Sequence, residues 1–197
     1  MTIAEITEVV LRDKDYYDRS GGGVTLSGGE PLLDREIACA LLSRIRENGV
    51  HTAVETALHI PRSTLDAVIP LADYFMCDLK AADGVLHKRL TGADNTRILQ
   101  NIRYLVERDV SMKLRMPMVP TMNDGEDNIR QTAEFLKTLP RMPELELLKF
   151  HNLATAKYDL LGRPYPAGEI QPPDNMQMDR YVESFRRYGV TAFYQKS

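Results

Sequence analysis

Hydrophobic and polar positions alternate along the chain with two periods, one typical of helices and one of strands. Thr2 and Glu5 have the spacing of a helix capping box, and the apolar positions that follow predict an opening helix that ends before Gly21. Six short apolar stretches predict strands, at Val24–Ser27, Thr52–Thr56, Tyr74–Leu79, Ser111–Val119, Leu145–Phe150 and Val190–Tyr194. Helical spacing predicts helices between Asp34 and Gly49 and over Pro61–Ile69, Arg97–Arg108, Asp127–Leu139 and Met176–Tyr188.

This alternation predicts an α/β fold in which helical crossovers join parallel strands, as a doubly wound sheet or as a full or partial barrel. Pro117 fits poorly inside a central strand. The opening helix has no strand before it, which is expected if a strand is missing upstream or if the helix is an accessory one. A long loop is expected over Asn152–Pro173, and with no linker in 197 residues we expect one domain spanning 1–197.

Composition narrows the class of protein. No apolar run approaches the roughly 18 residues of a membrane span, so no membrane association is expected. A net charge of −3 argues against nucleic acid as a partner, because nucleic-acid binders usually carry a clustered basic face. The first residues carry no signal peptide, so the cytoplasm is the expected location. Cys39 and Cys77 are far apart and are expected to be buried core thiols.

Polar residues follow the predicted strands where the strands end. They are Ser27–Glu30, Glu55–Thr56, Asp78–Lys80, Arg115 and His151. Singly, each fits a solvated strand end or a structural hydrogen bond. Because the carboxyl ends of parallel strands meet at one edge, together they predict a small-molecule site. Gly28 and Gly29 leave room for a ligand beside the backbone, and the Glu30 carboxylate suits an ammonium group rather than a phosphate.

The segment Ser20–Leu33 closely resembles the Gly-Gly-Glu region of the pyruvate formate-lyase activating enzyme family, the glycyl-radical enzyme activating enzymes of the radical S-adenosylmethionine (radical SAM) superfamily. Later blocks resemble this family in the same order, at Glu55–Thr56, Met76–Lys80, Thr91–Gly92, Arg115, Val119–Pro120, Asn123–Asp124 and Phe150–Leu153. The resemblance covers nearly the whole chain. It implies a partial parallel (β/α) barrel that lacks its N-terminal part.

The resemblance also implies roles for the residues at the strand ends. Gly28, Gly29 and Glu30 would hold the methionine amino group of S-adenosylmethionine. The rest of this cofactor would be lined by Thr56, Asp78, Lys80, Arg115 and His151. Arg115 and His151 would also face the glycine loop of a partner enzyme, and Glu55 with Asp78 would hold a monovalent cation.

In this family a reduced [4Fe-4S] cluster, held by Cys-x-x-x-Cys-x-x-Cys, donates the electron that cleaves S-adenosylmethionine. The resulting deoxyadenosyl radical takes a hydrogen atom from a backbone glycine of a glycyl-radical enzyme such as pyruvate formate-lyase, and a flavodoxin- or ferredoxin-type protein supplies the electron. This sequence has no such motif, and two isolated cysteines cannot hold the cluster. We therefore expect a truncated activating enzyme that is inactive alone, with no catalytic residue assignable in this chain.

Two other hypotheses remain open. The first is a cluster-free regulatory protein that keeps the cofactor pocket or the partner-docking surface. The second is an unrelated phosphosugar-handling barrel, which would need a phosphate site late in the chain. No glycine cluster that opens a helix follows His151, which argues against the second hypothesis.

Overall fold

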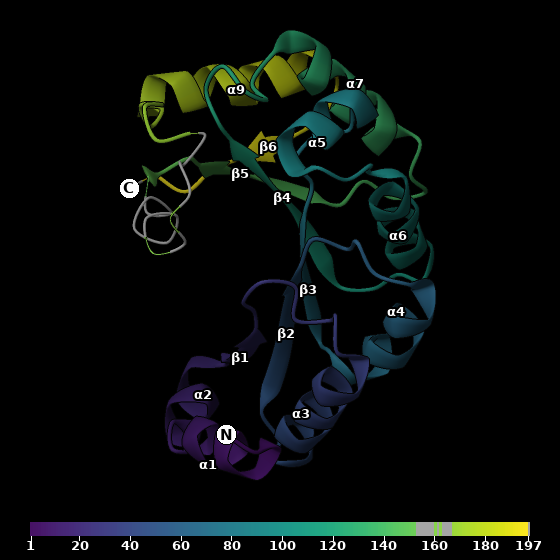
Figure 1. The fold of residues 1–197 in the computed structure, drawn as a ribbon, viewed down its shortest axis with the longest axis vertical. Helices are drawn as coiled ribbons and strands as arrows, with labels where there is room; N and C mark the ends of the chain where they lie inside the picture. The colour runs from purple at the N-terminus through teal and green to yellow at the C-terminus, as the bar shows by residue number, and fades with distance from the viewer. Residues whose placement is uncertain (153–159, 161, 163–166, 197) are drawn as a thin grey trace. The chain divides into compact units, whose positions relative to one another are not determined.

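The computed structural model describes residues 1–152, 160, 162 and 167–196 (Figure 1). Its six strands form one open sheet in chain order, and the pairs β1–β2, β2–β3 and β5–β6 are parallel. The strands are β1 (Gly23–Leu26), β2 (His51–Thr56), β3 (Tyr74–Asp78), β4 (Met112–Met118), β5 (Glu144–Lys149) and β6 (Ala192–Phe193). The predicted α/β class and partial barrel are confirmed.

The chain divides into two compact units. The first comprises Met1–Asp78 and Thr96–Lys113, and the second comprises Leu79–Asn95 and Leu114–Ser197. Strands β1 to β3 lie in the first unit, β5 and β6 lie in the second, and β4 contributes residues to both. The expectation of one domain over 1–197 stays a prediction.

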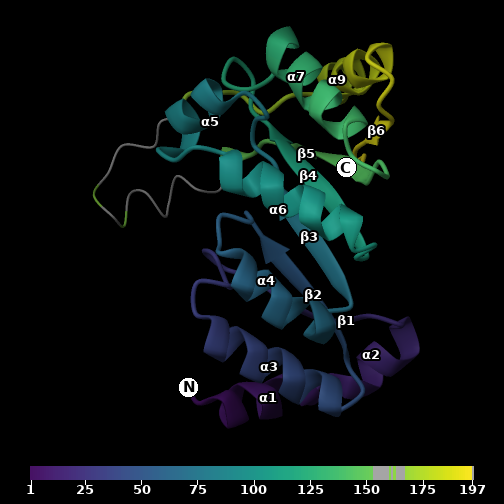
Figure 2. The ribbon, with the colours of Figure 1, turned by 90° about the vertical axis from the view of Figure 1, so that its right-hand side faces the viewer.

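In the first unit, α3 (Arg35–Glu47) packs against β1 and β2, and other helices pack against α3. The unit also contains α1 (Ile3–Leu11), α2 (Lys14–Ser20), α4 (Arg62–Val68) with the 3-10 helix η1 (Ile69–Leu71), and α6 (Thr96–Glu107). Helix α3 contacts β1, β2, α1 and α4, as Figure 2 shows. The predicted capping box is confirmed, because Thr2 Oγ1 accepts from the Glu5 amide and the Glu5 carboxylate accepts from the Thr2 amide. The opening segment forms two helices rather than one.

The core of this unit follows the two-residue period of the strands. Thr52, Val54 and Thr56 of β2 are buried, and the two residues between them are half-buried. Cys77 of β3 is fully buried, as expected for a core thiol, whereas Cys39 of α3 is half-buried. Ile37, in the first turn of α3, is half exposed, whereas Ala38, Leu41, Leu42 and Ile45 of this helix are buried. The register of β2 and β3 places Thr56 opposite Cys77.

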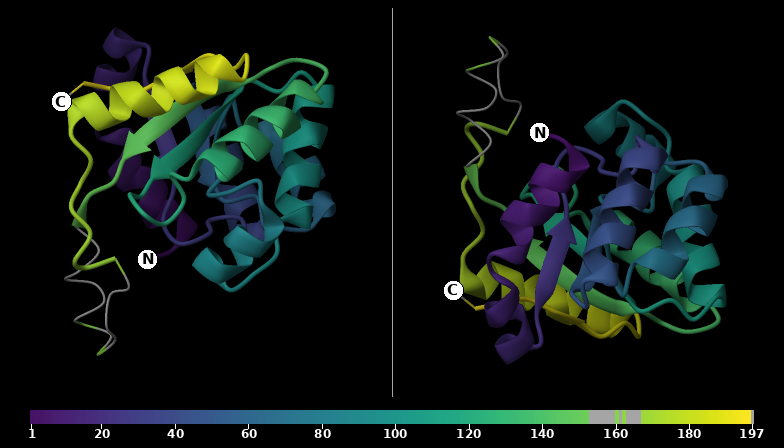
Figure 3. Two further views of the ribbon diagram at one scale, coloured as in Figure 1. Left: turned by 90° about the horizontal axis from the view of Figure 1, so that it is seen from above. Right: turned by 90° about the horizontal axis from the view of Figure 1, so that it is seen from below.

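The second unit contains α5 (Gly84–Thr91), α7 (Glu126–Lys137) and α9 (Asn175–Arg187). Helix α9 contacts α7, β5 and β6 (Figure 3, left). Helix α5 was not predicted from the sequence. It is short, begins at a glycine and is capped by Asp83, whose carboxylate accepts from the Leu86 amide.

Two sequence expectations concern this unit. Pro117 was expected to fit poorly in a strand, and it lies at the second-last position of β4, close to the carboxyl end. Most of the loop expected over 152–173 lies outside the described residues. Among the helices that the structure describes, none is long and apolar enough to cross a membrane.

Candidate functional site

The glycine pair after β1 presents bare backbone to open space. Gly28 has φ of +135°, a conformation that side chains strongly disfavour. A Cβ atom added at Gly28 or Gly29 would meet no atom within 4 Å. A ligand can therefore approach the main chain of both residues, which fits their expected role beside an amino-acid moiety.

Glu30 follows this pair, and its carboxylate is held by three donors from within the first unit. The Thr56 hydroxyl lies 2.8 Å and 2.9 Å from the two carboxylate oxygens, the Ala57 amide donates at 2.9 Å and the Leu32 amide donates at 3.2 Å. A carboxylate offers about four acceptor positions. The three protein donors therefore fix the carboxylate and leave it able to accept from a ligand ammonium group.

Thr56 is 2% exposed and stands between Glu30 and the turn after β2. Its Oγ1 donates to Glu30 and accepts from the Leu58 amide at 2.9 Å. Leu58 is fully buried and has φ of +59°, which is uncommon for a residue with a side chain. The direct contact of Thr56 with the cofactor stays a prediction, and the contact present here is with Glu30.

Asn101 of α6 holds the other side of this turn. It is 2% exposed, and its Nδ2 donates to the carbonyl oxygens of Leu58 and Ile60, both at 2.9 Å. The turn that carries the Ala57 amide is thus fixed by hydrogen bonds from both directions. Neither Asn101 nor Leu58 was singled out from the sequence, although an asparagine among the apolar positions of α6 was a signal.

Glu55 and Asp78 lie at the ends of neighbouring strands in the first unit. Glu55 pairs in register with Met76, and Asp78 directly follows Cys77, the register partner of Thr56. Both acidic residues are half-buried, and both make further interactions. No group of three or more metal-ligating side chains is found in the described ranges, so the monovalent cation at Glu55 and Asp78 stays a prediction.

Lys80 and Arg115 belong to the second unit, where the backbone brings their segments together. The Leu79 amide donates to the Arg115 carbonyl oxygen at 2.9 Å. Arg115 is half-buried and lies on the face of β4 opposite to Leu114 and Met116, which are fully buried. The Lys80 segment therefore lies directly beside β4.

Asn123 joins the Lys80 segment to the carboxyl end of β4. It is 2% exposed, and its Nδ2 donates to the carbonyl oxygens of Lys80 at 2.9 Å and Pro117 at 2.6 Å. Its Oδ1 accepts from the Val119 amide at 2.8 Å. Asparagine often bonds nearby backbone in turns, and here it holds the segment that carries Lys80. The sequence indicated Asn123 as part of a family block without giving it this role.

His151 lies two residues after the end of β5 in the second unit. Its imidazole is exposed, whereas the neighbouring Phe150 is buried. On the other side, Asn152 donates to the Ile170 carbonyl oxygen at 3.1 Å. The segment around His151 is thus anchored on both sides while His151 itself is exposed, and its role facing a partner stays a prediction.

The residues of this chain fit one of the two expected cofactors. The open backbone at Gly28 and Gly29 and the acceptor carboxylate of Glu30 suit the ammonium group of S-adenosylmethionine. They do not fit a [4Fe-4S] cluster, which takes cysteine thiolates, because the chain has two cysteines and Cys77 is fully buried in β3. The residues of this chain therefore cannot hold a cluster by themselves.

Comparison with known proteins identifies the family of this chain. The Radical SAM superfamily matches residues 1–136. The chain is 39% identical over 190 residues to the (2S)-3-sulfopropanediol dehydratase activating enzyme of Klebsiella oxytoca, covering 95% of this chain and 60% of that protein. It is 33% identical over 194 residues to the pyruvate formate-lyase-activating enzyme of Staphylococcus epidermidis, covering 95% of this chain and 76% of that protein.

A solved structure is similar as well. A domain of the pyruvate-formate lyase-activating enzyme from Bacteroides vulgatus ATCC 8482 superposes with a TM-score of 0.73 at 33% identity, covering 89% of this chain and 99% of that chain. Proteins of the radical SAM superfamily use S-adenosylmethionine and a [4Fe-4S] cluster. The present chain spans 60% or less of the length of several of its relatives. On these similarities, the chain belongs to the radical SAM superfamily, in the family of glycyl-radical enzyme activating enzymes.

Proposed function

We propose that this chain is the cofactor- and partner-binding part of a glycyl-radical enzyme activating enzyme, and that it acts only together with a cluster-bearing segment outside these 197 residues. The observation that carries the proposal is the Glu30 carboxylate, oriented by Thr56 and Ala57 beside the open backbone of Gly28 and Gly29. The proposed partner is a glycyl-radical enzyme similar to pyruvate formate-lyase. The proposed electron donor is a flavodoxin- or ferredoxin-type protein, and the proposed location is the cytoplasm.

Each residue has a distinct part in this proposal. Glu30 accepts from the cofactor ammonium group, and the glycine pair lets the cofactor lie against the main chain. Thr56 acts through Glu30, while Asp78 and Lys80 contact the rest of the cofactor. Arg115 and His151 orient the glycine loop of the partner. When bound, S-adenosylmethionine supplies the adenosyl fragment that removes a hydrogen atom from that glycine.

Binding of S-adenosylhomocysteine and S-adenosylmethionine, measured by calorimetry on this chain, tests the cofactor site. We expect weak binding of both, because the cluster that would anchor the cofactor amino and carboxylate groups is not held by this chain. Glu30→Gln should abolish the remaining binding. The matched control is Glu36→Gln, an exposed position in the first turn of α3, which should leave the affinity unchanged. Tight binding of S-adenosylmethionine, or an unaltered affinity in Glu30→Gln, would contradict the assignment.

The DNA upstream of Met1, read in the same frame, tests the need for a further segment. If it encodes Cys-x-x-x-Cys-x-x-Cys, the joined protein should assemble a cluster and generate a glycyl radical in pyruvate formate-lyase, detected by electron paramagnetic resonance. The present chain should generate none. If a stop codon and a ribosome-binding site precede Met1 instead, the activating role fails for this gene product. The cluster-free regulatory role would then replace it.

A further inference from the structure

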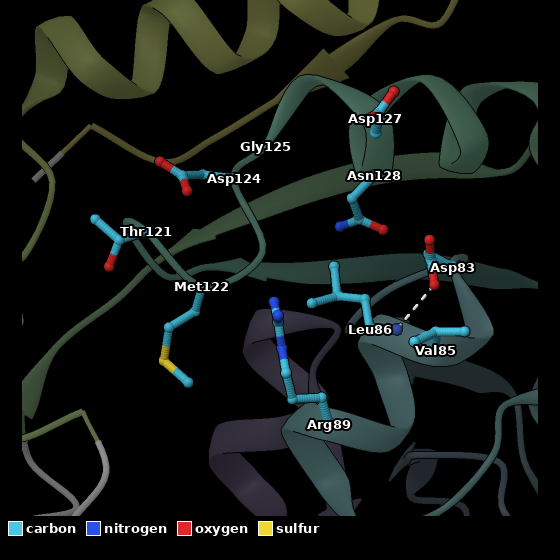
Figure 4. A pocket seen from close by; sticks show the side chains of 10 residues that line it. All are labelled: Asp83, Val85, Leu86, Arg89, Thr121, Met122, Asp124, Gly125, Asp127 and Asn128. Carbon is cyan, nitrogen blue, oxygen red and sulfur yellow. Dashed lines mark hydrogen bonds between the residues drawn. The ribbon is translucent and has the colours of Figure 1, made fainter.

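A pocket of about 500 Å³ opens in the second unit beside α5 and the loop that joins β4 to α7 (Figure 4). This volume lies within the roughly 300–1,000 Å³ that is typical of small-ligand sites. None of the residues assigned above to the cofactor or the glycine loop lines it. The pocket is therefore a separate feature that the proposed cofactor site does not use.

The pocket walls carry more negative than positive charge. Asp83, Asp124 and Asp127 line it, and Arg89 is the cationic side chain among the lining residues. Asp127 lies at the rim, where its side chain is 90% exposed and pairs with Arg130 at 3.5 Å. The pKa of Asp83 is lowered, chiefly by the hydrogen bond from the Leu86 amide, so this carboxylate is charged near neutral pH. Asp124 accepts from the Tyr181 hydroxyl at 2.9 Å. The surplus of carboxylates favours a ligand that donates hydrogen bonds and carries positive charge.

The side chain of Asn128 is an independent indication that the pocket lacks a hydrogen-bond donor. It is 3% exposed, lines the pocket, and points into it from α7 in Figure 4. Its Nδ2 donates to the Asn123 carbonyl oxygen at 2.8 Å, but its Oδ1 has no hydrogen-bond partner among the described residues. Leaving a buried acceptor unpaired costs about 1–3 kcal/mol, which a ligand donor would offset.

The pocket also offers donors. Within the part of the chain that the structure describes, Arg89 makes no hydrogen bond or ion pair, although its charge contributes to the lowered pKa of Asp83. The first turn of α7 follows Gly125, which provides no side-chain cap. The Asn128 amide donates to the Gly125 carbonyl oxygen at 3.0 Å, so the amides that can reach an acceptor are those of Glu126 and Asp127. Glu126 and Asp127 in this turn offset the partial positive charge of the helix end. Donors and acceptors thus line the same pocket.

We propose that this pocket binds a lysine or arginine residue of a partner polypeptide. The basic side chain donates to Asp83 and Asn128, and the peptide carbonyl of the same residue accepts from Arg89 or from the first turn of α7. A free amine has no acceptor for Arg89, and a carboxylate ligand is repelled by the three aspartates. A basic residue within a polypeptide can bond the acceptors and the donors of the pocket at the same time. This inference does not depend on the cofactor site proposed above.

The test is a titration of the 15N-labelled chain, followed by nuclear magnetic resonance. The probe is Nα-acetyl-lysine-N-methylamide, with Nα-acetyl-glutamate-N-methylamide and butylamine as comparison ligands. We expect the lysine probe to shift the Asn128 side-chain amide and the Arg89 Nε–H signals with a millimolar Kd. The glutamate probe should cause no saturable shift, and butylamine should bind several-fold more weakly.

Two variants each remove one negative charge from the pocket and should leave the fold intact. Asp83→Asn keeps a good helix cap for α5, and Asp127→Asn changes a side chain that is 90% exposed. Each should lower the affinity for the lysine probe about three- to tenfold, as expected for the loss of one nearby charge. Added salt should weaken binding to the unmodified chain. The matched control, Glu107→Gln at the exposed end of α6 in the first unit, should leave the affinity unchanged.

Three results would overturn the proposal. The first is a glutamate probe that binds as tightly as the lysine probe. The second is an unaltered affinity in both aspartate variants. The third is butylamine binding equal to that of the lysine probe, because it would assign the pocket to a free amine instead of a polypeptide.

Discussion

The Thr56 hydroxyl oxygen lies 2.8 Å and 2.9 Å from the two carboxylate oxygens of Glu30, although the residues are 26 positions apart in the chain. This contact joins the loop after β1 to the end of β2. The same hydroxyl accepts from the Leu58 amide, so a single side chain links the proposed ligand-binding carboxylate to the strained turn behind it. The orientation of Glu30 therefore depends on residues outside the Gly-Gly-Glu segment.

Thr56→Val should lower both stability and ligand affinity. Valine has nearly the same shape but cannot donate to Glu30 or accept from Leu58, and the loss should be about 1–3 kcal/mol of the free energy of unfolding. Urea unfolding measures the stability, and S-adenosylhomocysteine titration measures the affinity. Thr25→Val, at an exposed position of β1, is the control and should change neither. A Thr56→Val variant with unaltered affinity would show that Glu30 is oriented by its backbone donors alone.

Asn101→Leu should loosen the turn after β2. The carbonyl oxygens of Leu58 and Ile60 lose their shared donor, and we expect destabilisation by about 1–3 kcal/mol. Hydrogen exchange at the Ala57 amide, which donates to Glu30, should become faster relative to amides elsewhere in the first unit. Gln100→Leu, exposed on the same helix, is the control. If Ala57 exchange changes only in proportion to global stability, Asn101 has no specific role in holding this turn.

The two glycines beside Glu30 should respond differently to alanine. Gly28→Ala forces a side chain into a disfavoured backbone conformation and should destabilise the fold by about 1–3 kcal/mol. Gly29 has no such constraint and its added Cβ meets no protein atom, so Gly29→Ala should fold normally. Its methyl group would instead occupy the space proposed for the ligand and lower the affinity for S-adenosylhomocysteine. Unaltered affinity in a folded Gly29→Ala chain would place the ligand elsewhere.

Asp73 should make the free energy of unfolding depend on pH in the acid range. Burial alone would raise its pKa, but hydrogen bonds from the Thr52 amide and hydroxyl and the charge of Arg46 outweigh burial and lower the pKa below the usual 3.8. Because the folded-state pKa is depressed, this stabilisation is present above the unfolded pKa and is lost as pH falls through the folded pKa.

Unfolding free energies measured from pH 6 down to pH 2 check this dependence. The unmodified chain should lose more stability over this range than Asp73→Asn, whereas Asp13→Asn, at an exposed carboxylate, should follow the unmodified chain. Parallel pH profiles for Asp73→Asn and the unmodified chain would show that Asp73 contributes no pH-dependent stability.

The sequence predicted most elements because their signals are local. The capping box at Thr2 and the alternating pattern of β2 act over a few residues, and both are confirmed. Helix α5 was missed because it is short and flanked by glycines, so its periodicity is weak and its stability depends on the Asp83 cap. The single opening helix was wrong because the chain turns between Leu11 and Lys14.

The sequence by itself determined the family, the order of the strands and of most helices, and the presence of acidic and glycine residues at the strand ends. These properties depend on local residue spacing and on side-chain chemistry. Only the tertiary structure decided that Thr56 bonds Glu30, that Asn101 bonds the turn at Leu58, and that Asn123 holds the Lys80 segment. Each of these contacts joins residues 26 to 43 positions apart, and their geometry depends on how the strands and helices pack, which no local pattern encodes.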